Sequence, residues 1–254
     1  MLQGRTALVT GAGNGIGRAV SLDLARHGVR VIGTGRTDES LQQTREILLR
    51  EGLDMDIRVC DGASAVEVET LRHDLANERV SILVNNAGVA GPVAALTEVE
   101  VEDWDATFAN NVRAVFLMCK AFIPGMVANR LGDVVNIASV SGKRPLPNRT
   151  PYCASKMAVI GLSTTLAWEV GEFGVKVNSL SPGPVDGPRI RSVLSAAAER
   201  TGGSYEDAAE SFLSRTAMHR MLSEEEVAAG VRMVIETDGL TAADLDLSAG
   251  MVAR

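Results

Sequence analysis

The sequence predicts an α/β fold in which a doubly wound parallel sheet of about seven strands carries helices on both faces. Two observations lead to this prediction. Short runs rich in Val, Ile and Leu alternate along the chain with longer segments whose apolar residues recur at helical spacing. No internal repeat, low-complexity segment or linker interrupts this alternation, which is typical of parallel sheets with crossover helices. We therefore expect one domain over residues 1–254.

The strands are predicted where short apolar runs stop at Gly, Asn, Asp or Ser. A strand of a parallel sheet is covered on both faces, so its sequence is nearly continuously apolar. The intervening segments have helical patterns, of which the two longest lie at about 103–128 and 152–173. The expected strands are 5–10, 29–34, 55–60, 80–85, 132–138, 175–180 and 244–248.

A glycine-rich turn, Thr10-Gly-Ala-Gly-Asn-Gly-Ile-Gly17, joins the first predicted strand to the first predicted helix. Free backbone N–H groups and the dipole of a helix N-terminus both attract anions, so this arrangement predicts a phosphate site. Its glycines are spaced one residue more loosely than the Gly-x-Gly-x-x-Gly fingerprint of dinucleotide-binding proteins. We expect dinucleotide binding here, with contacts from Gly11, Asn14, Gly15, Ile16 and Gly17.

Tyr152 and Lys156 lie four residues apart in an apolar run with helical character, which places both side chains on one helical face. A phenol ordinarily titrates near pH ~10, so it transfers protons near neutral pH only where a positive charge stabilises the phenolate. An ammonium one turn away supplies that charge. A Tyr/Lys pair at this spacing is more often a solvated surface pair, but the glycine turn and Ser139, at the end of an apolar strand, favour a catalytic one.

These motifs together resemble the short-chain dehydrogenase/reductase family, and the resemblance covers essentially the whole chain. The resemblance implies a Rossmann-type fold, a nicotinamide cofactor, and hydride transfer between that cofactor and a carbonyl or secondary alcohol. It implies no particular substrate, because 3-oxoacyl thioesters, polyols, steroids and simple ketones all suit the family's scaffold. The matching motifs, in the family's order and at its usual separations, are the turn at 10–17, Asn85-Asn-Ala-Gly88, Asn111, Ser139, Tyr152 with Lys156, and Pro182-Gly183.

The resemblance implies roles for four catalytic residues. Tyr152 is expected to act as general acid in reduction and as general base in oxidation. Lys156 is expected to stabilise the phenolate and hold the nicotinamide ribose, and Ser139 to donate a hydrogen bond to the carbonyl oxygen. Asn111 is expected to hold a water that connects Lys156 to solvent, with Asn110 as the neighbouring alternative.

The end of the second predicted strand, Val31-Ile-Gly-Thr-Gly-Arg36, bears on the choice of cofactor. An acidic residue at the position of Gly35 selects NAD through the ribose 2′-OH, whereas an arginine pairs with the 2′-phosphate of NADP. Arg36 therefore favours NADP, and NAD is the alternative if Arg36 is only a solvated charge. Asn14 stands where some NADP-using relatives carry a second basic residue, which weakens the case for NADP.

The resemblance assigns further cofactor contacts outside the glycine turn. Asp61 matches the family's adenine-binding carboxylate, and the backbone of Val185 is expected to contact the carboxamide. An amide such as Asn85 or Asn86 serves equally well as a structural hydrogen bonder. The expected contacts are Asp61, Asn86, Gly88, Tyr152, Lys156, Gly183 and Val185.

The stretch 184–222 breaks the alternation of strands and helices, and such an excursion within a compact domain is usually functional. By the resemblance it covers the substrate, and we expect a mobile lid at about 187–215. Relatives commonly carry a threonine at the position of Gly187, so this lid lacks one hydroxyl contact to the cofactor. The side chains expected to close on the nicotinamide are Leu194, Phe212 and Leu213.

Composition argues against several other classes of protein. A net charge of −7 and an aromatic content of 4% disfavour nucleic acid as a partner. No uninterrupted run of ~18 apolar residues is present. Met1 leads straight into the first strand, so neither a membrane span nor a signal peptide is expected. We therefore expect a cytoplasmic protein whose substrate is a small molecule.

The cysteines and histidines have no spacing typical of a metal site or a disulfide framework. We expect free thiols and no bound metal. Cys153 is expected to pack in the core and not to act with its neighbour Tyr152, since adjacent residues on a helix point about a quarter-turn or more apart. The residues concerned are Cys60, Cys119, Cys153, His27, His73 and His219.

The two long helical patterns carry more apolar positions than one face of a sheet needs. Relatives bury this surplus across two-fold axes, so a homotetramer, or at least a dimer, is expected. The positions concerned are Trp104, Phe108, Phe116, Leu117, Leu162, Leu166 and Trp168.

Two questions about function stay open at the level of sequence. Arg144 and Arg149, in the loop after Ser139, are either surface charges or ligands of an anionic substrate, and the first interpretation is preferred. The alternative to an enzyme is a non-catalytic dinucleotide-binding sensor or scaffold on the same fold. The presence of both Tyr152 and Lys156 favours the enzyme.

Overall fold

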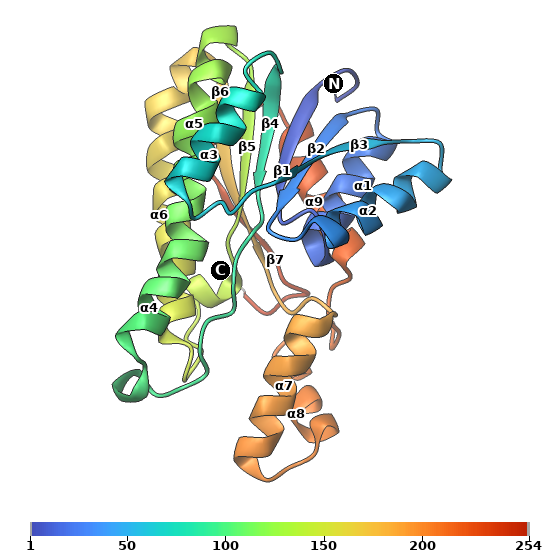
Figure 1. Ribbon diagram of the computed structural model, residues 1–254. Helices are drawn as coiled ribbons and strands as arrows, with labels where there is room; N and C mark the ends of the chain where they lie inside the picture. Colours follow the sequence, from blue (N-terminus) through green and yellow to red (C-terminus); the bar gives the residue numbers. More distant parts are fainter. Residues whose placement is uncertain (1, 253–254) are drawn as a thin grey trace.

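The computed structural model shows seven parallel strands in one sheet, ordered β3-β2-β1-β4-β5-β6-β7 (Figure 1). It describes residues 2–252, apart from the side chains of residues 189, 200 and 201. The predicted parallel sheet is confirmed, and each strand lies within two residues of its expected bounds. The strands are β1 (Thr6–Thr10), β2 (Arg30–Gly35), β3 (Met55–Val59), β4 (Val80–Asn85), β5 (Gly132–Ile137), β6 (Val175–Pro182) and β7 (Asp244–Leu247).

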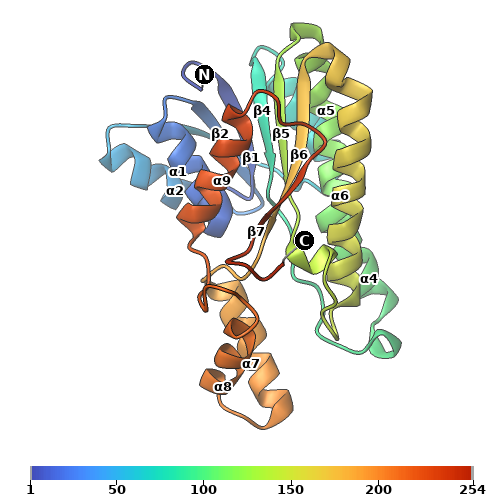
Figure 2. The same ribbon diagram turned by 180° about the vertical axis from the view of Figure 1, so that it is seen from behind.

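Helices cover both faces of the sheet (Figures 1 and 2). One apolar cluster joins the sheet to α1, α2 and α9, and a second joins the opposite face to α3, α5 and α6. The helices are α1 (Gly15–Arg26), α2 (Asp38–Arg50), α3 (Ala65–Asp74), α4 (Val101–Phe108), α5 (Ala114–Asn129), α6 (Thr150–Val170), α7 (Pro188–Thr201), α8 (Tyr205–Leu213) and α9 (Glu224–Glu236). Short 3₁₀ turns lie at Leu96–Glu98, Val140–Gly142 and Gly171–Phe173, and a π-helical turn, Ala109–Arg113, joins α4 to α5.

The position of β1 between β2 and β4 determines where a ligand can bind. The strand order reverses at this point, because β2 and β3 continue to one side of β1 and β4 to β7 continue to the other. In open α/β sheets the crevice at such a reversal, outside the carboxyl ends of the strands, is the usual ligand site. The helices α7 and α8 project beyond this end of the sheet (Figures 1 and 2).

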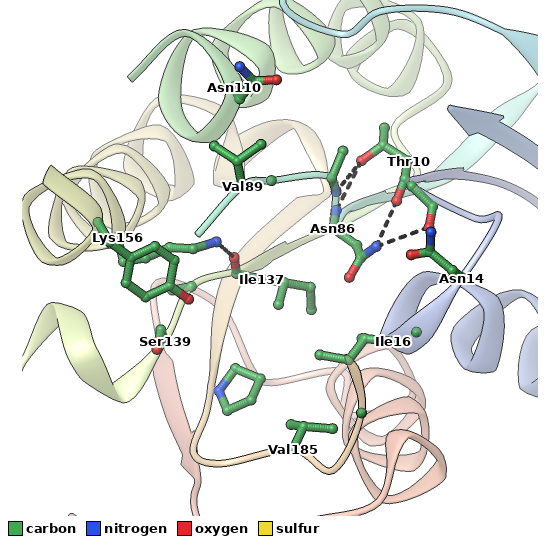
Figure 3. Close-up of a pocket in the computed structure, with 18 of the residues that line it drawn as sticks. Thr10, Asn14, Ile16, Asn86, Val89, Asn110, Ile137, Ser139, Lys156 and Val185 are labelled. Atoms are coloured by element: carbon green, nitrogen blue, oxygen red, sulfur yellow. Dashed lines mark hydrogen bonds between the residues drawn. The ribbon is translucent and has the colours of Figure 1, made fainter. Parts of the chain in front are cut away.

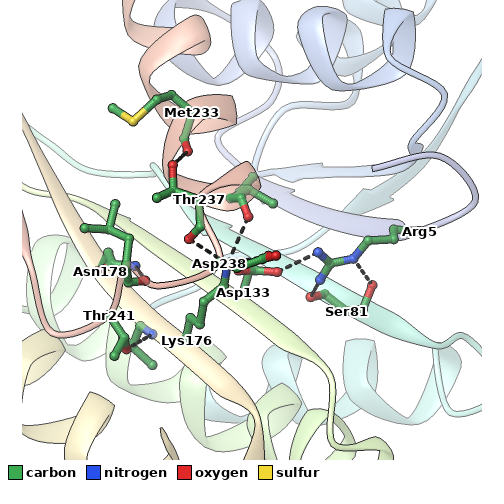
Figure 4. A network of polar contacts seen from close by, with 12 residues as sticks. Arg5, Ser81, Asp133, Lys176, Asn178, Met233, Thr237, Asp238 and Thr241 are labelled. Carbon is green, nitrogen blue, oxygen red and sulfur yellow. Dashed lines mark hydrogen bonds and ion pairs between the residues drawn. The ribbon is translucent and has the colours of Figure 1, made fainter. Parts of the chain in front are cut away.

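A polar network fastens the strands together near their amino ends (Figure 4). Its centre is the buried carboxylate of Asp133, which pairs with Arg5 at 2.6 Å and with Lys176 at 3.0 Å. Arg5 also donates to the backbone carbonyl of Ser81, and Lys176 donates to the carbonyl of Thr237. Because the two cations neutralise the buried carboxylate, we assign this network a structural role.

One helical stretch, Val101–Asn129, is long and apolar enough to cross a membrane by length and composition alone, with a mean hydropathy of 1.4. Core helices of soluble proteins meet the same criteria. In this chain Met118, Phe122 and Ile123 of the stretch are buried in the cluster that joins α5 to the sheet.

Candidate active site

A pocket of about 720 Å³ opens at the carboxyl ends of the strands. The segments that follow β1, β2, β3, β4, β5 and β6 all contribute to its walls, together with residues of α7, α8 and α9. The sheet therefore brings together motifs that are more than a hundred residues apart in the chain.

The glycine turn forms one wall of the pocket. Asn14 is the extended N-cap residue of α1, and Asn14, Gly15 and Ile16 line the cavity. A Cβ on Gly17 would overlap the carbonyl oxygen of Gly11 and the side-chain amide of Asn86, and it would stand 2.7 Å from the carbonyl carbon of Gly11. Only glycine fits at position 17, so the turn can lie close against the loop that follows β4.

Asn86 fixes the loop after β4 to the end of β1 (Figure 3). Its Nδ2 donates to the carbonyl oxygens of Thr10, at 3.0 Å, and of Gly11, at 3.4 Å. Its backbone N–H donates to the hydroxyl of Thr10. Asn85 is buried and donates to Oδ1 of Asn136 at 2.8 Å. Both amides therefore have structural hydrogen bonds, and Asn86 and Gly88 also line the cavity as expected.

The adenosine end of the expected cofactor site is formed by the ends of β2 and β3. Arg36 is exposed and lines the pocket, and among the described residues its guanidinium has no hydrogen bond or ion pair. Asp61 also lines the pocket, and its Oδ1 accepts a hydrogen bond from the backbone N–H of Ala63. A second cation, Arg18, lines the same wall and donates to the carbonyl of Gly13 at 2.5 Å. The sequence analysis missed Arg18, although its place in the first turn of α1 was a signal.

Ser139, Tyr152 and Lys156 line the opposite end of the pocket. Ser139 follows β5 and accepts a hydrogen bond from the backbone N–H of Ser141 at 3.1 Å. Lys156 is buried, donates to the carbonyl of Ile137 at 2.7 Å, and has its Nζ 5.9 Å from the centre of the Tyr152 ring (Figure 3). The end of β5 and the first turns of α6 thus bring three of the four predicted catalytic side chains to one pocket.

Asn111 lies behind the pocket wall: Asn110 lines the cavity and Asn111 does not, but Asn111 is bonded to Val89, which does. Asn111 lies in the π-helical turn, is only 1% exposed, and exchanges hydrogen bonds with the backbone N–H and C=O of Val89 at 2.7 and 3.0 Å. Its Nδ2 also donates to Ser155, whose hydroxyl donates to the carbonyl of Tyr152. Asn110, the alternative, donates to the carbonyl of Ala106 in its own helix. The geometry therefore links Asn111, and not Asn110, to the Tyr152 helix.

The preferred prediction for Arg149 is wrong, because this residue is not a surface charge. It is 5% exposed, donates to the carbonyl of Ala90 at 2.7 Å, and has its guanidinium carbon 5.1 Å from the centre of the Tyr152 ring. Arg149 is the N-cap residue of α6, so it lies one turn before Tyr152 and shares the pocket wall with it. Arg144 is half-buried and also lines the pocket.

The expected contacts of the lid are corrected in part. Phe212 lines the pocket as predicted, but Leu194 is only 2% exposed and neither Leu194 nor Leu213 lines the cavity. Leu194 and Ala198 lie one turn apart on α7 and are both buried, and α7 packs against α8. The residues of α7 that do line the pocket are Pro188, Ile190 and Val193.

The start of the lid is fastened to β7 and to the segment before α9. The backbone N–H of Gly183 donates to Leu247, and Val185 pairs in parallel with Leu222. Glu224, at the start of α9, reaches toward both the glycine turn and the lid: its Oε1 lies 3.5 Å from the Cβ position on Gly15 and 3.2 Å from that on Gly187. Burial raises the pKa of this carboxyl. The sequence analysis missed Glu224, because only the fold brings it to the pocket.

Burial disfavours the thiolate form of the three cysteines. Burial raises the pKa of Cys60 to about 11 and that of Cys119 to about 12, and it also raises the pKa of Cys153. A thiolate is the nucleophilic form, so these groups are poor nucleophiles. Within residues 2–252, no group of three His, Cys, Asp or Glu side chains is placed to hold a metal ion.

Comparison with known proteins gives a consistent family assignment. The family model of the short chain dehydrogenases matches residues 5–198. Ketoacyl reductase 1 of the granaticin polyketide synthase from Streptomyces violaceoruber is 36% identical over 96% of this chain and 92% of its own. The 3-oxoacyl-[acyl-carrier-protein] reductase of Haemophilus influenzae is 36% identical over 72% of this chain and 74% of its own.

Solved structures agree with this assignment. A variant of the actinorhodin polyketide ketoreductase with NADPH superposes with a TM-score of 0.93 at 33% identity, covering 99% of this chain and 98% of its own. A xylitol dehydrogenase with bound NAD⁺ gives a TM-score of 0.93 at 27% identity, covering 98% of this chain and 99% of its own.

Proposed function

Because the chain belongs to the short chain dehydrogenase family and is thus an NAD(P)-dependent oxidoreductase of carbonyl and CH–OH groups, we propose that it reduces 3-oxo compounds with NADPH. The observation that carries this proposal is the layout of the pocket. Ser139, Tyr152 and Lys156 line one end, and Arg36 lies at the other. The identity to two ketoacyl reductases supports a 3-oxo substrate, and polyols are the second candidate because a D-threitol dehydrogenase is 38% identical.

The residues at the end of the pocket that holds Ser139, Tyr152 and Lys156 have different roles in carbonyl reduction. A nicotinamide bound beside these residues would supply the hydride that the carbonyl carbon accepts. Tyr152 gives its phenolic proton to the carbonyl oxygen as negative charge develops there. Ser139 donates a hydrogen bond to the same oxygen. Lys156 places a positive charge beside the phenol, and the carbonyl of Ile137 holds its ammonium in place.

An assay tests the proposal and its non-catalytic alternative together. The enzyme is supplied with NADPH or NADH and with a 3-oxobutanoyl thioester, a simple ketone or, in the oxidative direction, a polyol. We expect consumption of NADPH with the 3-oxo compound. NADPH binding with no turnover of any of these compounds would instead favour a sensor or scaffold.

Cofactor preference is expected to reverse when Gly35→Asp is combined with Arg36→Ala. The new carboxylate repels a 2′-phosphate, and a Cβ at position 35 meets only Leu41, at an ordinary 3.7 Å, so the backbone need not move. The ratio of kcat/KM for NADPH to that for NADH should fall roughly 10²-fold. Arg36→Ala alone is the control and should lose NADPH without gaining NADH. A wild-type enzyme that already prefers NADH would contradict the role given to Arg36.

We further propose a homotetramer built on α5 and α6. Phe116 and Trp168 are 48% and 85% exposed on these helices, whereas Leu117, Leu162 and Leu166 are partly buried against the core. Trp168→Glu is expected to lower the mass measured by light scattering, because a charge would be buried in the subunit contact. Val66→Glu is the control, since Val66 is also apolar, is 78% exposed and lies on α3. A wild-type protein with the mass of a monomer at micromolar concentration would contradict the proposed tetramer.

The remaining proposals concern the whole chain. Residues 1–254 act as one domain in the cytoplasm, with about 187–215 as a lid over bound substrate. The projection of α7 and α8 beyond the sheet, with Ile190 and Phe212 lining the pocket, supports the lid.

A further inference from the structure

The adenosine end of the pocket carries both signs of charge, with Arg18, Arg36 and Asp61, whereas among the described residues the loop beside the catalytic groups contributes only cations. Three arginines, Arg144, Arg149 and Arg215, line the pocket from the loop before α6 and from the segment after α8. Among the described residues, the carboxylates that line it are Asp61, which follows β3, and Asp186 and Glu224 near the start of the lid. No described carboxylate therefore lies in the loop that carries Arg144 and Arg149 beside the catalytic groups.

Two of these arginines have uncompensated charges. The guanidiniums of Arg144 and Arg215 make no hydrogen bond or ion pair with any described residue. By contrast, Asp186 at the start of the lid is paired with Arg191 at 3.2 Å. Closing a lid over unpaired cations removes them from water at a cost, unless an anion enters with them.

Arg149 places a third cation next to the reacting groups. Its guanidinium is held by the carbonyl of Ala90 and lies 5.1 Å from the centre of the Tyr152 ring. It is fixed to the first turn of the helix that carries Tyr152, so the two side chains keep their spacing. An anion that contacts this wall therefore lies only a few bonds from a carbonyl oxygen that Tyr152 protonates.

We propose that the substrate carries a carboxylate close to the reacting carbonyl, as in a short 3-oxo acid, and that Arg144, Arg149 and Arg215 bind this carboxylate. The proposal rests on the reductase function proposed above and specifies the substrate class of the same site. Guanidinium groups are suited to this task because their planar N–H donors match the two oxygens of a carboxylate.

The first experiment needs no variant. It compares kcat/KM of the wild-type enzyme for 3-oxobutanoate, for its neutral methyl ester and for its coenzyme A thioester, whose anionic groups lie far from the carbonyl. We expect the free acid to exceed the ester by about tenfold or more, with the advantage shrinking as salt screens the charges. An ester that reacts as well as the acid would overturn the proposal. A preference for the thioester alone would overturn it too, because the arginines would then bind the phosphate groups of coenzyme A and not a carboxylate near the carbonyl.

The second experiment uses substitutions. Arg144→Gln and Arg215→Gln should each lower kcat/KM for 3-oxobutanoate about tenfold or more, while kcat/KM for the ester changes less than about twofold. Arg79→Gln is the matched control, because Arg79 is exposed, has no described side-chain partner and does not line the pocket. Arg149→Met should likewise lower kcat/KM for the acid more than for the ester. Because this variant also loses the hydrogen bond to Ala90, its melting temperature and its affinity for NADPH are measured to detect structural damage. Equal losses for acid and ester in the first two variants would refute the carboxylate site.

A binding measurement separates this proposal from the reductase function. Calorimetry of the enzyme with NADP⁺ compares butanoate with butanamide, which has the same shape and no charge. Tighter binding of butanoate by about tenfold or more is expected even if no substrate turns over. Equal affinities would refute the carboxylate site. The proposed reduction of neutral 3-oxo compounds by NADPH would not be affected by that result.

Discussion

Replacing Tyr152 by phenylalanine is expected to lower kcat by roughly 10²–10⁴-fold or more, the usual contribution of a general acid–base group. The substitution removes the transferable proton and keeps the ring near Lys156 and Arg149, whose cations lie 5.9 and 5.1 Å from its centre. The affinity for NADPH, measured by fluorescence titration, should therefore stay within about twofold of the wild type. Steady-state and single-turnover rates with a 3-oxo substrate measure the loss.

The chain contains a matched control for this experiment. Its other tyrosine, Tyr205, is the first residue of α8 and does not line the pocket. Tyr205→Phe should therefore retain the wild-type kcat. If Tyr152→Phe also keeps near-full kcat, the proton comes from another group and the proposed mechanism is wrong.

Gly17→Ala is expected to damage both cofactor binding and stability. Its Cβ would overlap the carbonyl of Gly11 and the amide of Asn86, neither of which can move without breaking the contact between the ends of β1 and β4. Overpacking of this kind costs about 1–3 kcal/mol, and each kcal/mol lowers Tm by roughly 2–4 °C in a protein of this size. The Kd for NADPH should rise about tenfold or more, because the N–H groups of the turn no longer converge on a phosphate.

Gly125→Ala is the control for this prediction. Gly125 lies inside α5, its φ is not positive, and a Cβ there meets nothing within 4 Å. Alanine is the better helix former, so this substitution should leave Tm unchanged or raise it slightly. Calorimetric scans of both variants, with and without NADPH, make the comparison. A Gly17→Ala enzyme with the Tm and Kd of Gly125→Ala would show that the close approach at position 17 is not required.

The parts of the fold that sequence predicted well have local causes. The strands were found within two residues because burial on both faces of a parallel sheet makes their sequences continuously apolar. The first helix was found because glycines and helical periodicity mark its start. Tyr152 and Lys156 were placed on one face because helical spacing alone brings residues four apart together.

The parts that sequence predicted poorly depend on contacts between distant segments. Arg149 looked like a surface charge because a loop sequence does not show that Ala90, far back in the chain, accepts its hydrogen bond. Leu194 looked like a pocket residue because it is apolar, and its apolar character does not show that the packing of α7 buries it away from the cavity. Arg18 and Glu224 carried no motif of their own, yet both line the pocket.

The sequence by itself thus determined the order of strands and helices, and it predicted the glycine turn as the phosphate site and Tyr152 with Lys156 as the groups that transfer a proton. These features follow from backbone sterics and from spacing along one element, which a single stretch of chain encodes. Only the tertiary structure decided which charges face the substrate, because that depends on the reversal of strand order beside β1 and on how the lid and α9 pack over it. The charges that line the pocket come from segments that lie far apart in the sequence and that the sheet brings to one cavity.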